Sequence, residues 1–374
     1  MSRPLRDVVI AAVALGVIAL ALFLAGCGGT GSTQSSTAQL QAQPQAQAIT
    51  AARHFLNLYV DPDGRVVRRD QGGDTVGEGQ AYGMLLAAAI GDSQRFNAIW
   101  DWTQNNLRRP DGLLEFRWSD GRVQSTQAAS DADLDASRAL LLAACRFHRP
   151  ALRLQAVQLG NSILRVEVAS FQGVPVLTAG PWAVTPPITI DPSYFSPATF
   201  VALQAASGDA RWGALAASSR SITSELMSPP WKLPPDWALL EGDKPVPIGT
   251  PSDPQARPEF SFDAVRTLVR MAEDPNPAGP RIAARAWPVF EGANPANLPV
   301  QHDLSGQPIG DVRNPVVLVA AAGAADAAGH AAARDGLLDE AQALDLRFPT
   351  YYGAAWVALG RMMLTTKLLD PTCS

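Results

Sequence analysis

The chain has 374 residues, 47% of them hydrophobic and 17% charged, and its 30 Lys and Arg against 35 Asp and Glu give a formal net charge of −5. This composition supports a large buried core, and a modest acidic excess without a basic cluster argues against nucleic acid as a partner. The histidines (His54, His148, His302 and His330) lack the spacing of metal ligands, so we expect no zinc site and no cofactor.

The first 26 residues have the features of an export signal. Arg3 and Arg6 form a short basic region, an apolar run extends from Val8 to Leu24, and the run closes with Leu-Ala-Gly-Cys27, the pattern of a bacterial lipoprotein signal. We therefore expect lipidation of Cys27 and an exported protein held at the membrane of the cell envelope. A run of about 17 residues also approaches a spanning length, which leaves an uncleaved membrane anchor open.

Residues 27–47 are rich in Gly, Ser, Thr, Ala and Gln and poor in large apolar residues. Such a segment buries too little surface to offset the entropy of ordering it, so we predict a flexible linker. Residues 48–370 show no second linker and are expected to form one domain. Within this domain Cys145 lies in an apolar helical stretch, which favours a buried free thiol, although export also permits a disulfide with Cys373.

The apolar periodicity of the body is helical almost throughout. Apolar residues at three- and four-residue spacing, often preceded by Ser, Asp or Pro, indicate an all-α domain. The predicted helices are Ala48–Tyr59, Gln80–Ile90, Ser93–Leu107, Asp133–Phe147, Ala151–Val168, Pro197–Ser207, Arg211–Met227, Phe262–Glu273, Arg281–Phe290, Val316–Ala333, Asp335–Leu344 and Ala354–Leu368. A helical solenoid would give a similar pattern, but no repeat of fixed period is visible.

Two long Pro-rich stretches, 173–194 and 229–259, interrupt the helices. The first contains β-branched residues and is compatible with a short strand pair. Loops of this length inside a compact domain are usually functional or mobile. We therefore expect them to border a binding site.

Two segments concentrate carboxylates at predicted helix starts. Val76-Gly-Glu78-Gly-Gln-Ala-Tyr-Gly-Met-Leu-Leu86 places one acid between two glycines, and Ala129-Ser-Asp131-Ala-Asp133-Leu-Asp135 places three acids within five residues. Clustered or buried carboxylates are costly, because like charges repel and burial disfavours ionisation. A plain alternative is helix capping, since Ser and Asp are good caps.

These two segments resemble the glycoside hydrolases of family 8. Four further segments agree in order and rough spacing, so that the resemblance extends from about Ala48 to about Leu368; they are Phe116-Arg-Trp118, Asp191-Pro-Ser-Tyr194, Pro235-Asp-Trp237 and Ser261-Phe-Asp-Ala-Val-Arg266. The resemblance implies an (α/α)6 barrel of six helical hairpins whose loops form a glycan cleft. It also implies an inverting endo-β-1,4-glucanase, or cellulase, without a cofactor. The Asp-Pro-Ser-Tyr and Pro-Asp-Trp segments are similar to those of endoglucanases that accompany bacterial cellulose synthases. The resemblance therefore implies a monomer whose partner is an exopolysaccharide synthesis system.

The resemblance also assigns roles to residues. Glu78 stands at the position of the general acid, Asp263 at that of the general base, and Asp131 at that of the residue that bonds and distorts the sugar. The expected substrate-binding residues are Gln80, Tyr82, Trp118, Asp133, Tyr194 and Arg266. Glu78 lies at a helix start, where the dipole favours the ionised form, so burial and the charge of Asp131 must raise its pKa for it to act as an acid.

Two alternative functions stay open. A hydrolase of the same fold could act on xylan, mixed-linkage glucan or chitosan; a chitosan site would need additional acids facing the amines, and Asp133 and Asp135 are candidates. The other alternative is a glycan-binding lipoprotein without catalysis. Departures from the family pattern, such as Gly77 before the acid and Phe262 in place of Tyr, leave substrate detail and efficiency undecided.

Overall fold

The computed structural model describes residues 32–371. The chain divides into an N-terminal unit, Met1–Gln41, and a compact body, Ala42–Ser374. The α-helices are α1 (Ser32–Tyr59), α2 (Gly77–Ala89), α3 (Ser93–Leu107), α4 (Ser130–Arg146), α5 (Pro150–Val166), α6 (Pro197–Ser207), α7 (Arg211–Leu226), α8 (Ala264–Ala272), α9 (Ala278–Ala284), α10 (Trp287–Phe290), α11 (Pro315–Ala327), α12 (Ala331–Arg347) and α13 (Tyr351–Thr365).

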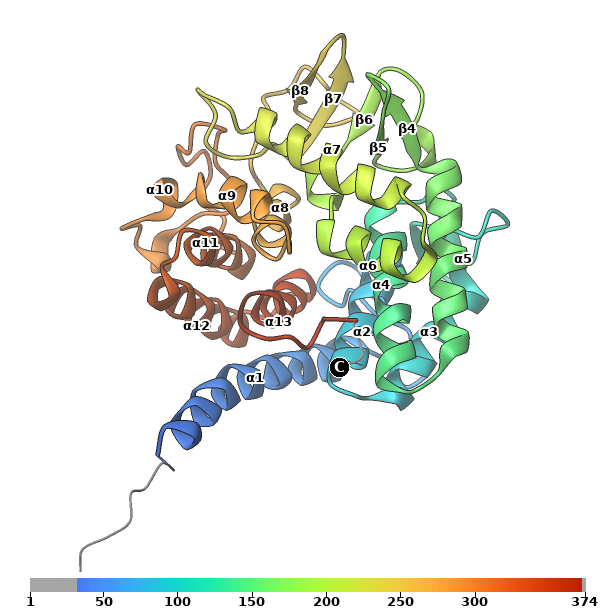
Figure 1. Ribbon diagram of the computed structural model, residues 1–374, viewed down its shortest axis with the longest axis horizontal. Helices are drawn as coiled ribbons and strands as arrows, with labels where there is room; N and C mark the ends of the chain where they lie inside the picture. The colour runs from blue at the N-terminus through green and yellow to red at the C-terminus, as the bar shows by residue number, and fades with distance from the viewer. Residues whose placement is uncertain (1–31, 372–374) are drawn as a thin grey trace, which may run out of the picture. The chain divides into compact units, whose positions relative to one another are not determined.

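The helices of the body form two concentric rings (Figure 1). The inner ring closes through contacts in the order α2, α4, α6, α8, α11, α13 and back to α2. The outer helices α3, α5, α7, α9 and α12 each pack against the inner helix next to them in sequence, and α1 packs on α13 through Phe55 and Tyr59 against Tyr351. The body is therefore an (α/α)6 barrel, as the sequence resemblance implied.

The composition of the inner helices explains why they can be surrounded on all sides. Helix α2 is buried at every position except Glu78, and α11 is buried from Pro315 to Ala325. Both helices consist mainly of Ala, Gly, Val and Leu, and a helix that is apolar all round belongs in a core. Small residues also allow close approach, since a Cβ at Gly360 of α13 would lie 2.3 Å from Val319 of α11.

Short antiparallel strands occupy the connections between helices. They are β1 (Thr75–Val76), β2 (Arg117–Ser119), β3 (Arg122–Ser125), β4 (Val168–Phe171), β5 (Val174–Leu177), β6 (Ile188–Ile190), β7 (Trp237–Glu241) and β8 (Lys244–Ile248). They form the sheets β1-β2-β3, β4-β5 and β6-β7-β8. The predicted strand pair within 173–194 is not formed: β5 and β6 lie there but pair with β4 and β7. The Pro-rich stretch 229–259 contributes the hairpin β7-β8, because antiparallel pairing satisfies the backbone of an extended loop.

Most predicted helix ends lie within four residues of the observed ends, and the ranges 281–290 and 316–333 are among those that differ further. The range 281–290 divides into α9 and α10, because Pro288 has no N–H to donate and cannot continue α9. The helix predicted for 316–333 ends at Ala327, and Gly329 then adopts a φ of +83°. Turn residues of this kind end a helix even where the apolar pattern continues.

The N-terminal predictions have a mixed outcome. The predicted signal and Cys27 lie outside the described residues. The predicted flexible linker is wrong for residues 32–47, which belong to helix α1, because Ala and Gln, which dominate this segment, are good helix formers although they offer little apolar surface. Among residues 32–371, no helix combines the length and apolar character needed to cross a membrane.

Cys145 forms a disulfide bond. The free thiol that its apolar helix suggested is therefore wrong. Helical periodicity reports burial but carries no information on a cysteine brought near by distant parts of the chain.

Candidate active site

The N-terminal ends of the inner helices α2, α8, α11 and α13 border a cavity of about 420 Å³. Glu78 lies in the first turn of α2, Asp263 immediately precedes α8, and Tyr351 begins α13. All three line the cavity, together with Arg68, Phe262 and Tyr352. Helix N-termini carry partial positive charge, which suits a site rich in carboxylates.

Arg266 gathers four carboxylates in this region. Its Nη1 donates to Asp131 Oδ2 at 2.8 Å and reaches Glu78 Oε2 at 3.4 Å. Its Nη2 donates to Asp263 Oδ1 at 2.7 Å and reaches Asp191 Oδ2 at 3.4 Å. We call Arg266 with these four carboxylates the Arg266 cluster. One buried cation cannot neutralise four acids, so the cluster disfavours full ionisation.

Glu78 is the member whose protonation this arrangement controls. Burial, followed by the charges of Asp131 and Asp263, raises its pKa to about 7, against the opposing effect of Arg266. The two effects predicted to oppose the helix dipole, burial and Asp131, are thus confirmed. A carboxyl group that stays protonated near neutral pH is suited to protonate a leaving group.

Phenol groups complete the surroundings of Glu78. The hydroxyl of Tyr351 lies 3.4 Å from Oε1 and that of Tyr82 lies 3.4 Å from Oε2. Gly79 makes the first contact feasible, because a Cβ at this position would lie 2.7 Å from the Tyr351 hydroxyl. The glycine next to the acid therefore serves close packing.

Asp131 is not the N-cap residue of its own helix. The N-cap of α4 is Ala129, without a side-chain cap, and Asp131 instead accepts hydrogen bonds from Arg266 and from the amide of Ala132 at 2.8 Å. Burial raises the pKa of Asp131, against the charge of Arg266. Asp131 therefore satisfies one amide of the first turn of α4 and also belongs to the Arg266 cluster, so helix capping by itself does not describe this residue.

Asp191 belongs to the cluster although no role was predicted for it. It precedes the 3-10 turn η2 (Pro192–Tyr194), is fully buried, and accepts from the amide of Ser193 at 2.8 Å. Burial and the charge of Asp263 raise its pKa well above the usual value. A signal was present in the sequence, since the acid directly follows an apolar run, but the run alone does not show which side chains it faces.

Two predicted substrate-binding residues lie away from the cavity. Gln80 is fully buried. Its side-chain Oε1 accepts from the backbone amide of Val66 at 2.6 Å, and its Nε2 donates to the hydroxyl of Thr103 at 2.8 Å. Asp133 is also fully buried and accepts from the amide of Leu114 at 2.9 Å. Both predictions of sugar contact are wrong, because the helical turn directs these side chains into the packing between elements.

Two other predicted binding residues are buried next to the acids and contact them from the side away from the cavity. Arg266 is 1% exposed, and Tyr82 is fully buried with its hydroxyl 3.4 Å from Nη1 of Arg266. In this structure they position the carboxylates and do not reach the open cavity. Arg266 also forms an ion pair with Asp263 at 2.7 Å.

Aromatic side chains flank the cluster. Tyr194 lies under the guanidinium of Arg266, 5.1 Å from ring centroid to Cζ, and contacts Trp237, which in turn contacts the exposed Trp182. Trp118, also a predicted binding residue, lies in β2 against Arg65 and Trp102, and among the described residues no printed contact joins it to the Arg266 cluster. Aromatic rings offer an apolar face and a polar edge, the combination that sugar rings require.

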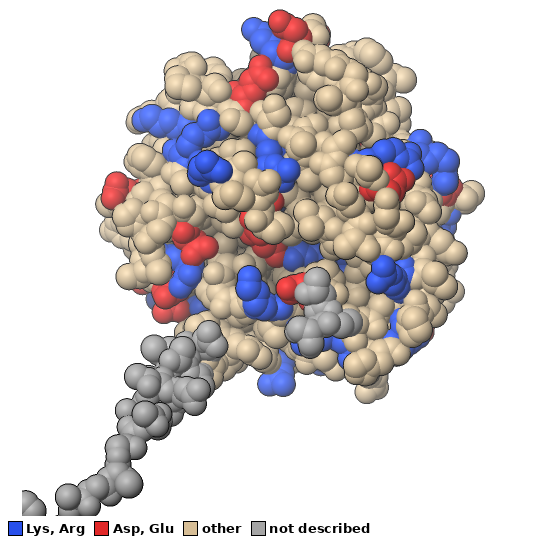
Figure 2. All heavy atoms as spheres, in the orientation of Figure 1, with Lys and Arg blue, Asp and Glu red and all other residues tan. Residues whose placement is uncertain are grey.

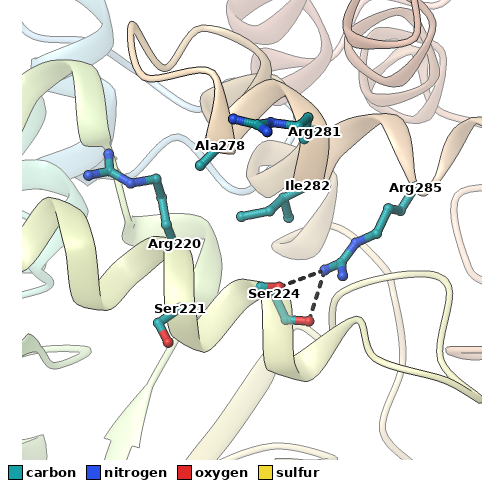
Figure 3. A pocket seen from close by; sticks show the side chains of 7 residues that line it. All are labelled: Arg220, Ser221, Ser224, Ala278, Arg281, Ile282 and Arg285. Atoms are coloured by element: carbon teal, nitrogen blue, oxygen red, sulfur yellow. Dashed lines mark hydrogen bonds between the residues drawn. The ribbon is translucent and has the colours of Figure 1, made fainter.

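A second hollow of about 410 Å³ lies between α7 and α9, where basic side chains gather in Figure 2. Figure 3 shows Arg220 and Arg285 on opposite sides of Ile282, with Arg285 directed at Ser224. Each guanidinium has a protein partner: Asp274 for Arg220, the carbonyl of Pro277 for Arg281, and Ser224 for Arg285. This hollow lies between two outer helices and shares no lining residue with the carboxylate cavity.

The described residues hold no group of three His, Cys, Asp or Glu side chains that could bind a metal ion. The titratable groups that line the cavity are carboxylates, two phenols and the guanidinium of Arg68.

Comparison with known proteins agrees with this geometry. The probable endoglucanase of Novacetimonas hansenii is 30% identical over 260 residues, 65% of this chain and 72% of that protein. The endoglucanase of Cellulomonas uda is 27% identical over 237 residues, 62% of this chain and 65% of its own length. The endo-β-1,4-glucanase CMCax of Acetobacter xylinum superimposes with a TM-score of 0.72 at 26% identity, over 85% of this chain and 97% of that one. Residues 34–306 match the model of the glycosyl hydrolases of family 8, and the chain belongs to that family.

Proposed function

We propose that the protein is an endo-β-1,4-glucanase that cleaves internal bonds of a β-linked glucan with inversion. The observation that carries the proposal is a carboxyl group with a pKa of about 7, Glu78, facing a second carboxylate, Asp263, across one cavity. Glycoside hydrolysis requires such a pair: one acid for the leaving oxygen and one base for the attacking water.

Inversion is supported by the resemblance to family 8, and the geometry of the pair is compatible with it. Glu78 and Asp263 contact the two terminal nitrogens of the same guanidinium. The contacting oxygens therefore lie within the roughly 9.5 Å upper limit for inverting glycosidases. Within the described part of the chain, no hydrogen bond engages Oδ2 of Asp263, so this oxygen can accept a proton from water.

Asp131 is proposed to bond the sugar at the cleavage point. Its bond to Arg266 uses Oδ2 and its bond to the amide of Ala132 uses Oδ1. Each carboxylate oxygen has a second lone pair, so Asp131, although only 2% exposed, keeps the capacity to accept a hydrogen bond from a sugar hydroxyl.

A matched panel tests the substrate. Wild-type protein and Asp263→Asn are incubated with carboxymethylcellulose, mixed-linkage glucan, xylan and chitosan, and reducing ends are counted while NMR follows the product anomers. We expect release from the β-1,4-glucan with α-anomers formed first. Faster release from xylan or chitosan would show that the proposed glucan is not the substrate. β-Anomers formed first would indicate retention in place of inversion, and binding without release would support a glycan-binding protein.

The chitosan alternative has lost its structural argument. It required acids that face the substrate, and Asp133 and Asp135 are both buried in contacts with protein groups. The relatives described above are named as endoglucanases, which supports a glucan.

We further propose that the protein is exported and held at a membrane by a lipid on Cys27. The Leu-Ala-Gly-Cys27 pattern supports this, and the disulfide of Cys145 is typical of oxidising compartments. Cys27→Ser should release an active body from washed membranes, whereas continued membrane binding would indicate that the apolar segment is the anchor. A polysaccharide synthesis system of the same cell remains the proposed partner, supported by the Asp-Pro-Ser-Tyr and Pro-Asp-Trp segments.

A further inference from the structure

Asp236 is bonded to the backbone on both sides of the proposed base. Its Oδ1 accepts from the amide of Ser261 at 2.8 Å and from the amide of Ala264 at 2.7 Å, and Asp263 lies between these residues. The amide of Asp236 donates to the carbonyl of Glu259 at 2.8 Å, which attaches the segment to the same loop a second time.

These bonds replace an ordinary helix cap. An aspartate that precedes a helix usually accepts from an amide of the first turn, as Asp92 does for Arg95 at the start of α3. Asp263 occupies the equivalent position before α8 but makes no such bond, because its carboxylate is turned to Arg266 and the cavity. Asp236, from a distant segment, supplies the acceptor instead.

This exchange matters for catalysis because it separates two tasks. A side chain that caps its own helix is held against the backbone and cannot also activate water in an open cavity. Asp236 satisfies the amides of the helix start, and Asp263 is left to face the substrate.

The same segment also places an aromatic ring. Trp237 follows Asp236, begins β7 and contacts Tyr194, whose ring lies beside Arg266. The position of the base and the position of this aromatic surface therefore depend on one stretch of chain.

We propose that Asp236 is a positioning residue that caps α8 in place of Asp263 and thereby holds the general base in its working orientation. The proposal rests on the proposed function of Asp263. Displacement of a reacting group by about 1 Å can cost about a hundredfold in rate, so the effect should appear in kcat.

Two variants separate the geometry of Asp236 from its charge. Asp236→Asn keeps Oδ1 in place and removes the charge, while Asp236→Glu keeps the charge and moves the oxygens by one methylene. Burial and the charge of Asp263 raise the pKa of Asp236 to about 7. The side-chain amide of Asp236→Asn therefore also imitates the protonated carboxyl group that Asp236 has below that pH. We expect Asp236→Asn to keep kcat within a fewfold of wild type and Asp236→Glu to lower it by about tenfold or more, with KM nearly unchanged in both.

Asp92→Ala is the matched control, since it removes an ordinary cap at the start of α3, which contributes no residue to the cavity. It should lower the melting temperature about as much as Asp236→Glu but leave kcat intact. The assay uses the full chain and a soluble cello-oligosaccharide, with wild type and Asp263→Asn measured alongside. Asp236→Glu with wild-type kcat, or Asp236→Asn as slow as Asp236→Glu, would overturn the proposal. A wild-type protein without hydrolysis, or an active Asp263→Asn, would instead overturn the proposed function.

Discussion

Two neighbouring ion-pair layers between helices α4 and α8 differ in their balance of charge. In the upper layer Arg266 contacts Asp131 of α4 and three further carboxylates. One turn further along both helices, Arg270 makes two hydrogen bonds, of 2.9 and 2.7 Å, to the single carboxylate of Asp135. The first arrangement leaves negative charge in excess, and the second is matched one to one.

A third layer continues the matched pattern. Arg138 of α4 pairs with Glu273 at 2.8 Å and donates to the carbonyl of Leu369 at 3.1 Å. The three layers follow the four- and three-residue spacing that places side chains on one helix face. Buried charges of similar kind thus have different consequences: in a matched pair the two charges neutralise each other, and in the unmatched cluster the excess of carboxylates shifts the pKa of Glu78.

The largest expected effect is on the unmatched layer. Glu78→Gln removes the proton donor and should lower turnover by about 10²- to 10⁴-fold, since general acid catalysis is worth that much. Rates on a cello-oligosaccharide check it, with circular dichroism to confirm folding. Glu115→Gln is the control, because burial also raises the pKa of Glu115 but its partner is Arg109. Equal losses in both variants would contradict a special role for Glu78.

A substitution in the matched layer should lower the free energy of unfolding and not the turnover. Asp135→Leu leaves Arg270 buried without its carboxylate, and breaking a buried pair in this way costs about 3–5 kcal/mol. Urea denaturation measures the loss, and turnover per folded molecule should stay near that of the wild type. The double variant Asp135→Leu/Arg270→Met should recover most of the stability, because no unpaired charge remains. A double variant as unstable as the single one would show that the Asp135–Arg270 pair adds to the free energy of unfolding beyond neutralising its own buried charges.

Removal of one charge from the unmatched layer should sharpen the contrast. Asp131→Asn should lower kcat about ten- to a hundredfold, the equivalent of a charge-assisted hydrogen bond, with little change in KM or melting temperature. Because Asp131 raises the pKa of Glu78, the alkaline limb of the kcat/KM profile should also move to lower pH. An unchanged profile would remove Asp131 from the control of Glu78.

The smallest expected effect is the pH dependence of stability. The pKa of Glu78 is raised to about 7 in the folded protein, so between its ordinary value and 7 the folded state binds more protons than the unfolded state. The free energy of unfolding should therefore fall as pH rises through this window, and Glu78→Gln should flatten the slope. Denaturation from pH 4.5 to 8 measures it; an identical slope in both proteins would contradict the raised pKa.

Local signals predicted the helices well where the end of a helix has its own chemistry. Helices α3 and α6 match the predicted ranges to the residue. Asp92 caps the first, and the second begins at Pro197 and ends at Gly208 with a φ of +75°. Such ends depend on bonds within a few residues, which a sequence displays directly.

The site was only partly visible in the sequence. Carboxylates at helix starts pointed to Glu78 and Asp131, but Gln80 and Asp133, two residues further along each helix, were taken for binding residues and are buried packing groups. A difference of two residues turns a side chain to another face of a helix, and only the neighbouring helices decide which face meets the cavity.

The sequence by itself determined that the body is helical, because the spacing of apolar residues is a local property of the chain. The motifs also identified the family and the acids that face the cavity. Tertiary structure alone decided that four carboxylates share Arg266, that Asp135 is matched by Arg270, and that Asp236 caps the helix of Asp263. These contacts join residues up to 188 positions apart. The pKa of each acid depends on the sum of such distant charges and on burial, neither of which is encoded in the residues beside it.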